Sequence, residues 1–363
     1  MKGNRGVRMS HVDAAESSAS TATPGRVRLA GVRLDSQLLE RAVLAHGLGS
    51  LRLSPLTFVA DTSTADGELG FHGTAATTTS KVGREIAGDV QRRRSALQVA
   101  GVPVPVGRVF EPDEVEEAIH YAEGVHFPVT VKPASRRRGG VATNLSGVAA
   151  VAAALAELHR SKYANRRFVV EQYVVGVSHR VLVIGDRAVS VLRCSDRRDV
   201  TDEVDAAVTD IAVRAVAAVP GLDHGGVDVV VDDGAAVVVE MDASPPLAEH
   251  EAPAAGPGRA VTAELVRSRL ASPPEPLGGG SPVRVDMMLY GMPEPDLVAA
   301  KLSWLADSLG LNAELGADGC LSAEIEGPLD AVSRMPALMA AEGIGPEIIE
   351  TSAPVSRAST AAA

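Results

Sequence analysis

Apolar and polar positions follow a hairpin pattern most clearly between residues 226 and 250, which read GVDVVVDDGAAVVVEMDASPPLAEH. Two apolar, β-branched runs, Val227–Val231 and Ala235–Glu240, flank the sequence Asp232-Asp233-Gly234. An Asp-Gly pair between such runs is typical of a tight turn between two strands. The pattern therefore predicts an antiparallel hairpin.

Three carboxylates are expected to converge at the open end of this hairpin. Symmetric pairing about the turn predicts that Asp228 lies opposite Val238 and diagonal to Glu240. Side chains alternate between the faces of a strand, so Glu240 and Asp242 point to the same side. Oxygen donors at this density suit Mg²⁺, which commonly takes one or two carboxylates together with substrate phosphates. The alternative interpretation is a solvated hairpin end, which the apolar flanking runs disfavour.

Helical and strand-like patterns alternate through the middle of the chain, which indicates an α/β or α+β enzyme scaffold. Residues 1–25 are rich in Ser, Ala, Thr and Gly and lack an apolar signal core, and we expect them and residues 354–363 to be disordered tails. The helical patterns lie at 92–100, 111–122, 146–158 and 202–219, and the strand-like runs lie at 125–131, 167–173 and 179–194.

The Pro- and Gly-rich residues 271–281 are expected to be a linker. Before it we place an N-terminal region at 26–105 and a larger unit at 106–270. After it, residues 282–353 show the order βαββαβ, which is the split βαβ layout of ferredoxin-like folds. At about 70 residues such a unit can hold a core of its own, so we expect it to fold alone.

Composition limits the partners. The 363 residues carry a net charge of −11, which argues against a nucleic-acid partner, since phosphate neutralisation needs a surplus of Lys and Arg. No apolar run reaches about 18 residues, so no membrane-spanning helix and no membrane partner are expected. The two cysteines match no metal or redox spacing, which fits a reducing cytoplasm. Self-association stays open.

Positive charge and glycine follow the predicted strand that ends at Lys132. The next residues are Ala134-Ser135 and then Arg136-Arg137-Arg138-Gly139-Gly140-Val141. Glycines allow close backbone approach to a ligand, and lysine and arginine supply charge for phosphate. The alternative is an exposed basic turn. No GxxxxGK[ST] sequence is present, so this is not a P-loop.

Other candidate residues carry weaker signals. Residues 171–174 end an apolar strand and could offer backbone groups to an adenine edge, or could be an ordinary strand end. Arg180 and Arg193 lie on adjacent predicted strands and could equally be surface arginines. His179, His224 and His250 could serve acid–base chemistry, although a lone histidine is more often a satisfied structural residue.

Four motifs in order give the chain a resemblance to the ATP-grasp ligases, in particular to the cyanophycin-synthetase-like branch. The motifs are TSKVGREIAGDVQRRRSALQVAGVPVP, KPASRRRGGVATNL, VEQYVVGVSHRVLVIGDRAVSV and GVDVV followed by VEMDASPPLAEHEAP. The resemblance runs from about Thr77 to Leu270. It implies two α+β lobes that clasp ATP, preceded by a short pre-ATP-grasp region.

The resemblance also implies a function and a set of site residues. The function is ATP-dependent carboxylate–amine ligation of amino acids or peptides through an acyl phosphate, with ATP and Mg²⁺ (or Mn²⁺) as cofactors. Small-molecule carboxylates and amines would be the substrates, and Arg180 and Arg193 would lie near the transferring phosphoryl group. The implied metal ligands are Asp228, Glu240 and Asp242, and the implied nucleotide-binding residues are Lys132, Arg138, Gly139, Gly140, Val141, Glu171, Gln172, Tyr173, Val174 and Ser178.

The chain departs from the family pattern at several positions. Val90 stands where the family usually has lysine, and Ser178 where an acid often binds ribose. Asp242 replaces the usual metal-binding asparagine, and Pro246 replaces a glycine. These departures leave a second hypothesis open, namely a non-catalytic nucleotide-binding partner of another ligase.

Residues 282–353 resemble the acylphosphatase-like fold, mainly through LADSLGLNAELGADGCLSAEIEG. The phosphate loop and the catalytic arginine and asparagine of that family are not matched. The resemblance therefore implies a non-catalytic accessory module.

Overall fold

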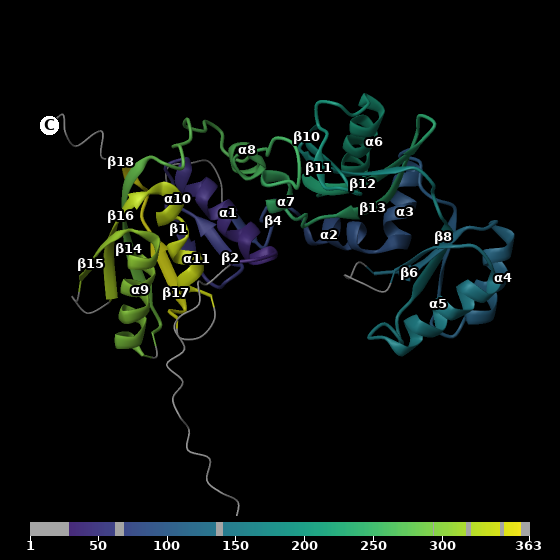
Figure 1. The fold of residues 1–363 in the computed structure, drawn as a ribbon, viewed down its shortest axis with the longest axis horizontal. Coiled ribbons are helices and arrows are strands. Elements are labelled where there is room, and N and C mark those ends of the chain that lie inside the picture. Colours follow the sequence, from purple (N-terminus) through teal and green to yellow (C-terminus); the bar gives the residue numbers. More distant parts are fainter. Residues whose placement is uncertain are drawn as a thin grey trace, which may run out of the picture.

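The computed structural model describes residues 29–61, 69–135, 141–292, 294–316, 321–341 and 345–356. The elements gather in two halves (Figure 1). One half combines the N-terminal elements, drawn purple, with the C-terminal elements, drawn yellow. The other half holds the teal elements from the middle of the chain. No described helix is long and apolar enough to cross a membrane.

The first half is built on a nine-stranded sheet. Its order is β15-β16-β14-β17-β1-β2-β3-β4, and β18 pairs with β14. The C-terminal strands are β14 (Pro282–Tyr290), β15 (Asn312–Gly316), β16 (Leu321–Pro328), β17 (Ile348–Thr351) and β18 (Val355–Ser356). The N-terminal strands are β1 (Ser50–Arg52), β2 (Thr57–Ala60), β3 (Gly70–His72) and β4 (Ala75–Ala76).

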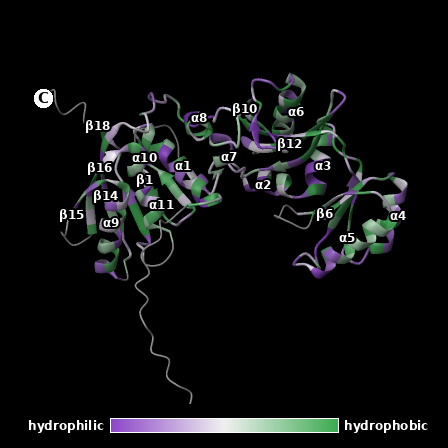
Figure 2. Cartoon of the chain, viewed as in Figure 1, coloured by the Kyte–Doolittle hydropathy of each residue, from purple (hydrophilic) through white to green (hydrophobic). Residues whose placement is uncertain are grey.

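Helices pack on one face of this sheet. Along β14 the buried side chains alternate with exposed ones, as expected for a strand with one covered face. The covered positions, including Val285 and Met287, form a core with the helices, among them α1 through Leu44. Hydrophobic residues, drawn green, recur along the helices and strands of this half (Figure 2). The helices are α1 (Val32–Ala45), α9 (Pro295–Leu309), α10 (Leu329–Val332) and α11 (Met335–Met339).

The expected order of strands and helices in residues 282–353 is present, but the unit does not stand apart. Strand β17 pairs with β14 on one side and with β1 on the other, where Ser50 lies opposite Thr351. The expected helix at 329–341 is divided into α10 and α11, and Pro336 lies in the first turn of α11, where its missing N–H costs nothing. The sheet therefore joins the N-terminal region to the C-terminal one.

Two segments near the C-terminal unit differ from the sequence-based expectation. The expected linker at 271–281 is docked, because the Leu277 N–H donates to the Ala45 carbonyl at 2.8 Å and the Asp330 N–H donates to the Gly279 carbonyl at 2.9 Å. Within the expected tail at 354–363, β18 pairs with β14. The rest of that tail and residues 1–25 lie outside the described residues.

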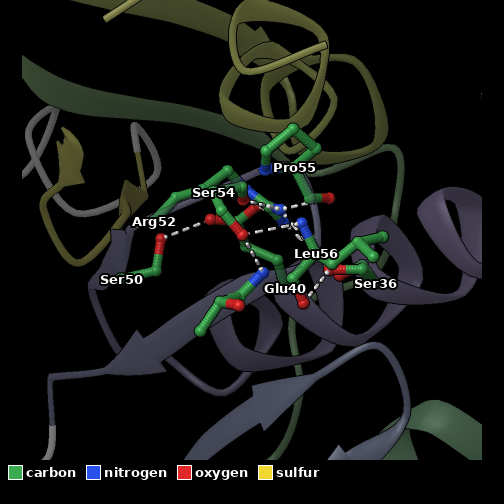
Figure 3. Close-up of polar contacts among 8 residues, drawn as sticks. Ser36, Glu40, Ser50, Arg52, Ser54, Pro55 and Leu56 are labelled. Atoms are coloured by element: carbon green, nitrogen blue, oxygen red, sulfur yellow. Dashed lines mark hydrogen bonds and ion pairs between the residues drawn. The ribbon is translucent and has the colours of Figure 1, made fainter. Parts of the chain in front are cut away.

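A buried ion pair fixes the N-terminal part of the sheet to α1 (Figure 3). Arg52 on β1 and Glu40 on α1 are both fully buried. The Arg52 Nε donates to Glu40 Oε2 at 2.9 Å, and the Ser50 hydroxyl donates to Glu40 Oε1 at 2.8 Å. The Arg52 Nη1 also donates to the Pro55 carbonyl at 3.2 Å. Each charge is thus compensated, as a buried charge requires.

The second half contains two further sheets. One has the order β11-β10-β9-β12-β13 and packs on α6, α2 and α3; the other has the order β5-β8-β6-β7 and packs on α4 and α5. The first set is β9 (Val177–Ile184), β10 (Arg187–Arg193), β11 (Arg198–Asp199), β12 (His224–Asp232), β13 (Ala235–Asp242), α2 (Lys81–Gly88), α3 (Val90–Val99) and α6 (Ala206–Ala217). The second set is β5 (Gly107–Phe110), β6 (Val129–Pro133), β7 (Ala142–Leu145), β8 (Phe168–Gln172), α4 (Val115–Gly124) and α5 (Val148–Arg160).

Helices α2 and α3 pack against the β9–β13 sheet, although the sequence suggested a division at residue 105. Ala87 and Leu97 belong to the same buried cluster as Val227 and Met241. The two halves are joined through α1, which packs on α8 (Val261–Arg267). Asp35 on α1 accepts the N–H groups of Leu247 and Ala248 at 2.9 and 2.7 Å, where α7 (Ala248–Glu251) begins.

Candidate active site

The predicted hairpin is confirmed as β12 and β13. Its turn residues Asp233 and Gly234 have φ angles of 43° and 80°, the two positive values that a type I′ turn requires. The predicted register is wrong for two reasons. The two-residue loop is centred between Asp233 and Gly234, so Val238 lies opposite Val229 instead of Asp228, and a further shift between Asp228 and Val229 leaves Val239 as an extra residue on β13. Asp228 consequently lies directly opposite Glu240.

A row of charged residues crosses three neighbouring strands at this point. Arg180 on β9 pairs in register with Asp228 on β12, which in turn pairs with Glu240 on β13. The Arg180 Nε and Nη2 donate to the two Asp228 carboxylate oxygens at 2.8 and 2.9 Å. This hydrogen bonding raises the pKa of Arg180 above its usual value. Asp228 and Arg180 therefore form a bidentate ion pair across the two strands.

The three predicted carboxylates do share one small cavity. Its volume is about 10 Å³, and its lining includes Arg180, Asp228, Glu240 and Asp242 together with Pro245 and Pro246. This is room for about one water-sized guest. The Asp242 Oδ1 accepts the Ser244 N–H at 2.8 Å, so the backbone orients this carboxylate.

Lys132 connects the two sheets of this half. It is nearly buried at the end of β6, and its Nζ lies 2.6 Å from Glu171 Oε1 on β8. The same Nζ lies 3.2 Å from the Val239 carbonyl and 3.6 Å from Glu240 Oε2 on β13. The lysine is thus held at the junction between the two sheets, beside the carboxylate row.

Two arginines of α3 complete the charged network. The sequence showed that the run 92–94 lies close to Val90, but it did not predict these arginines as site residues. The Arg93 Nη1 lies 2.8 Å from Glu240 Oε1, and the Arg94 Nη2 lies 2.7 Å from Glu171 Oε2. Both side chains are largely buried. Lys132, Arg93 and Arg94 thus surround the carboxylates of Glu171 and Glu240, and they are cations of the kind that bind phosphate oxygens.

The position of Val90 explains why the neighbouring arginines matter. Val90 is buried, and its N–H donates to the Ala134 carbonyl at 2.9 Å. Arg93 lies about one helical turn further along α3 and carries its charge to Glu240. The only sequence signal for this arrangement was the run of three arginines at 92–94 within a helical pattern.

Gly107 on β5 allows the Glu171 side chain of the neighbouring strand β8 and the Arg94 side chain of α3 to approach. A Cβ built at Gly107 would lie 2.4 Å from the Glu171 Cβ and 2.8 Å from the Arg94 Nη2. Any larger residue at this position would displace the carboxylate that holds Lys132 and Arg94.

Comparisons with known proteins match the part of the chain that contains these charged residues. Residues 89–244 match the family model of the carbamoyl-phosphate synthase L chain, ATP binding domain. Cyanophycin synthetase of Trichormus variabilis is 36% identical over 115 residues, which is 31% of this chain and 12% of that protein. Cyanophycin synthetase of Synechocystis is 36% identical over 112 residues, covering 30% of this chain and 12% of that protein. The chain contains an ATP-grasp domain related to that of cyanophycin synthetase.

Among solved structures, a bifunctional glutathione synthetase from Pasteurella multocida has a TM-score of 0.43 and 18% identity, covering 58% of this chain and 40% of that chain. The ATP-grasp ligase PsnB, complexed with a precursor variant, Mg and ADP, has a TM-score of 0.42 and 22% identity over 53% of this chain and 60% of its own.

Several residues implied by the resemblance lie at the edge of the cavity that Asp228, Glu240 and Asp242 line, or away from it. Arg193 pairs in register with His179, so it faces the opposite side of the sheet from Arg180, and its guanidinium binds Asp196. Ser178 precedes Arg180 by two residues on β9 and shares its face. Val141 is 54% exposed, and Arg138, Gly139 and Gly140 lie outside the described residues.

The residues expected to hold adenine also have structural partners. The Glu171 carboxylate is engaged by Lys132 and Arg94. The N–H groups of Gln172 and Tyr173 donate to the carbonyls of Val106 and Pro128 at 2.8 and 2.9 Å. Val174 is half-buried in the loop that follows β8.

The carboxylates that line the cavity fit a divalent cation only in part. The cavity is lined by carboxylate oxygens, the ligands that Mg²⁺ prefers. Within the described ranges, however, no group of three His, Cys, Asp or Glu side chains is placed to hold a metal. Asp228 explains this, because both of its oxygens bind Arg180. Glu240 and Asp242 remain a two-carboxylate set, which suffices for Mg²⁺ that also binds substrate phosphates.

Two of the histidines named from the sequence, His224 and His250, make contacts inside the folded protein. The His224 Nε2 lies 2.9 Å from the Thr74 carbonyl. The His250 Nδ1 lies 2.8 Å from the Ser190 hydroxyl, and its ring is fully buried. Burial, together with the nearby Arg180, lowers the pKa of His250 to about 4. His250 is therefore neutral at neutral pH.

The buried imidazole of His250 should make stability depend on pH. The unfolded chain binds a proton near pH 6.5, whereas the folded protein does so only near pH 4. The contribution of neutral His250 is therefore present above pH 6.5 and is lost as the pH falls toward 4, by at most about 3 kcal/mol. Urea unfolding at pH 7 and pH 5 should show a smaller pH-dependent loss in His250→Asn than in the wild type, and equal losses would refute the assignment.

Proposed function

We propose that this protein is an ATP-dependent carboxylate–amine ligase that forms an amide bond through an acyl phosphate. The observation that carries the proposal is the meeting of Lys132, from one sheet, with Glu240, from the hairpin of the other, at 3.6 Å. Phosphoryl transfer is catalysed chiefly by positioning and charge neutralisation. A junction where both lobes contribute opposite charges can do both.

Each charged residue has a proposed role in this reaction. Lys132 and Arg93 would bind ATP phosphates, and Arg94 would keep Glu171 beside Lys132. Glu240 and Asp242 would hold Mg²⁺ beside Asp228, whose oxygens bind Arg180, and the ion would neutralise phosphate charge when bound. Residues 172–174 would contact adenine, and the Gly139-Gly140 segment would cover the phosphates.

The reaction divides into two balanced steps. A substrate carboxylate oxygen attacks the γ-phosphorus of ATP, the bond to the β-phosphate oxygen breaks, and ADP leaves. An amine then attacks the acyl carbon, phosphate departs with the bonding electron pair, and the amine loses a proton. Arg180 lines the cavity that contains Glu240 and Asp242. It would stabilise the negative charge that moves from the attacking carboxylate oxygen to the leaving phosphate oxygen. Amino acids or short peptides are the proposed substrates.

The region after residue 282 has a proposed accessory role. Its sheet order β15-β16-β14-β17, with all neighbours antiparallel, supports a ferredoxin-like, acylphosphatase-like fold. The residues of the acylphosphatase phosphate site are not matched in the sequence. We therefore propose a non-catalytic module that stabilises the N-terminal region through β1 and β17.

Nucleotide binding tests the proposal most directly. Calorimetry with ATP and Mg²⁺ should show saturable binding to the wild type. Lys132→Met should weaken it about 10- to 100-fold, because a charge-assisted contact worth about 1.5–3 kcal/mol is lost. Lys81→Met is the matched control, since Lys81 is exposed on α2 and pairs only loosely with Glu85 at 3.9 Å. Absence of ATP binding in the wild type would refute the proposed function.

A second function, nucleotide binding without catalysis, is favoured by Val90 and Pro246. Val90 brings no charge to the phosphates, and Pro246 lines the carboxylate cavity without an N–H to donate. The two functions differ in one result. ADP release in a screen of amino acids and short peptides supports the ligase, whereas ATP binding with no release under any condition supports the non-catalytic partner.

A further inference from the structure

We propose that a second cavity, at the end of the nine-stranded sheet, binds a small molecule that carries a carboxylate or phosphate group. The cavity has a volume of about 230 Å³ and is lined by residues of β2, β3, β4 and α2. This is slightly below the range of about 300–1,000 Å³ for drug-sized ligands, so it suits a molecule of amino-acid size.

The cavity lies on the open face of the sheet. Thr57, His72 and Ala75 lie opposite one another on β2, β3 and β4, and all three line the cavity. Phe58 and Phe71 also line the cavity, and they belong to the buried core that includes residues of α1. The strands thus supply a rigid floor that is part of the folded core.

The side walls come from the other half of the molecule. Thr79 and Arg84 line the cavity from the start of α2, whose first turn is capped by the Ser80 hydroxyl. Thr79 is fixed in turn, because its hydroxyl donates to Asp223 at 3.1 Å. Cavities at the junction between two structural units are common ligand sites.

The charge of the lining selects an anion. The chain has a net charge of −11, yet none of the described lining residues is acidic. Arg84 is the charged residue among them, and the structure pairs it with no described carboxylate. The His72 Nδ1 lies 2.8 Å from the Thr57 hydroxyl, which fixes the ring and leaves its Nε2 for a ligand. A guanidinium, an imidazole and a hydroxyl around a cavity with apolar walls match a small anion with an apolar body.

This site is distinct from the proposed nucleotide site. None of the residues that line it contributes to the charged network of Lys132, Glu171 and Glu240. Binding can therefore be measured without ATP, and its outcome does not depend on whether the protein is a ligase.

The test follows the His72 ring by NMR in the full-length protein labelled at histidine, with His72→Gln used to assign the resonance. The probes are glutarate, inorganic phosphate and, as a neutral control, glutaramide. We expect a saturable shift with at least one anion and none with glutaramide. Arg84→Gln should weaken binding at least about tenfold, because it removes a charge-assisted hydrogen bond.

Lys81→Gln is the matched variant, since Lys81 lies one turn earlier on the same helix and does not line the cavity. It should bind the anion like the wild type. A response to glutarate alone or phosphate alone identifies which anion the site takes. The proposal is overturned if neither anion gives a saturable shift, or if Lys81→Gln weakens binding as much as Arg84→Gln.

Discussion

Replacing Arg52 with methionine should lower the free energy of unfolding by about 3–5 kcal/mol, because it leaves the Glu40 carboxylate buried without its charged partner. Both side chains are fully buried, and the arginine also satisfies the carbonyls of Ser54 and Pro55 (Figure 3). Urea unfolding of the two proteins at pH 7 gives the difference.

Two further variants show that burial causes this effect. The double variant Arg52→Met, Glu40→Leu should recover most of the lost stability, because no uncompensated charge remains. Arg198→Met removes an exposed arginine that pairs with Glu203 at 3.1 Å, and it should cost less than about 1 kcal/mol. A loss at Arg52 no larger than that at Arg198 would contradict the role given to the buried pair.

Glu240→Gln should reduce amine-dependent ADP formation at least about 100-fold. Even mutating a residue that only orients a metal ligand typically lowers metal affinity or activity about 10- to 100-fold, and Glu240 is a proposed ligand itself. Glu240 is central to the site, because it meets Arg93 at 2.8 Å and Lys132 at 3.6 Å and shares a cavity with Asp242. The amide keeps the shape of the side chain and removes its charge. Steady-state ADP formation with the best amine found in the screen measures the effect.

Asp242→Asn is the matched comparison for Glu240→Gln. It removes one charge from the same cavity, but it installs the residue that related ligases usually carry, so activity should be retained or increased. Circular dichroism spectra should be the same for all three proteins. Equal rates in the wild type and both variants would mean that these carboxylates hold no catalytic metal.

The hairpin shows which features of the site can be predicted from a few neighbouring residues and which cannot. The Asp233-Gly234 turn was predicted, because its positive φ angles depend on those two residues alone. The bulge at Val239 was not, because it depends on how β13 packs against its neighbours. That single extra residue places Glu240 opposite Asp228 and so determines the geometry of the charged row.

The buried cations Lys132, Arg93 and Arg94 illustrate a second limit of prediction from the sequence. Lys132 was predicted because it ends a buried strand, where a side chain reaches the sheet edge. Arg93 and Arg94 were not, because the helical phase that buries both is set by the packing of α3 between two sheets. Sequence comparison at position 90 alone suggested a missing charge, whereas the structure supplies charge about one turn later.

The pairing of β17 with β1 has a consequence for how the protein is made. Residues 50–52 leave the ribosome about 300 residues before their partners at 349–351. Until then β1 has only β2 beside it, and one edge of the N-terminal strands stays open to other chains. Contacts that span about 300 residues also form slowly. The N-terminal strands must therefore wait until β17 has been synthesised, and a chain truncated just before β17 would leave that edge exposed.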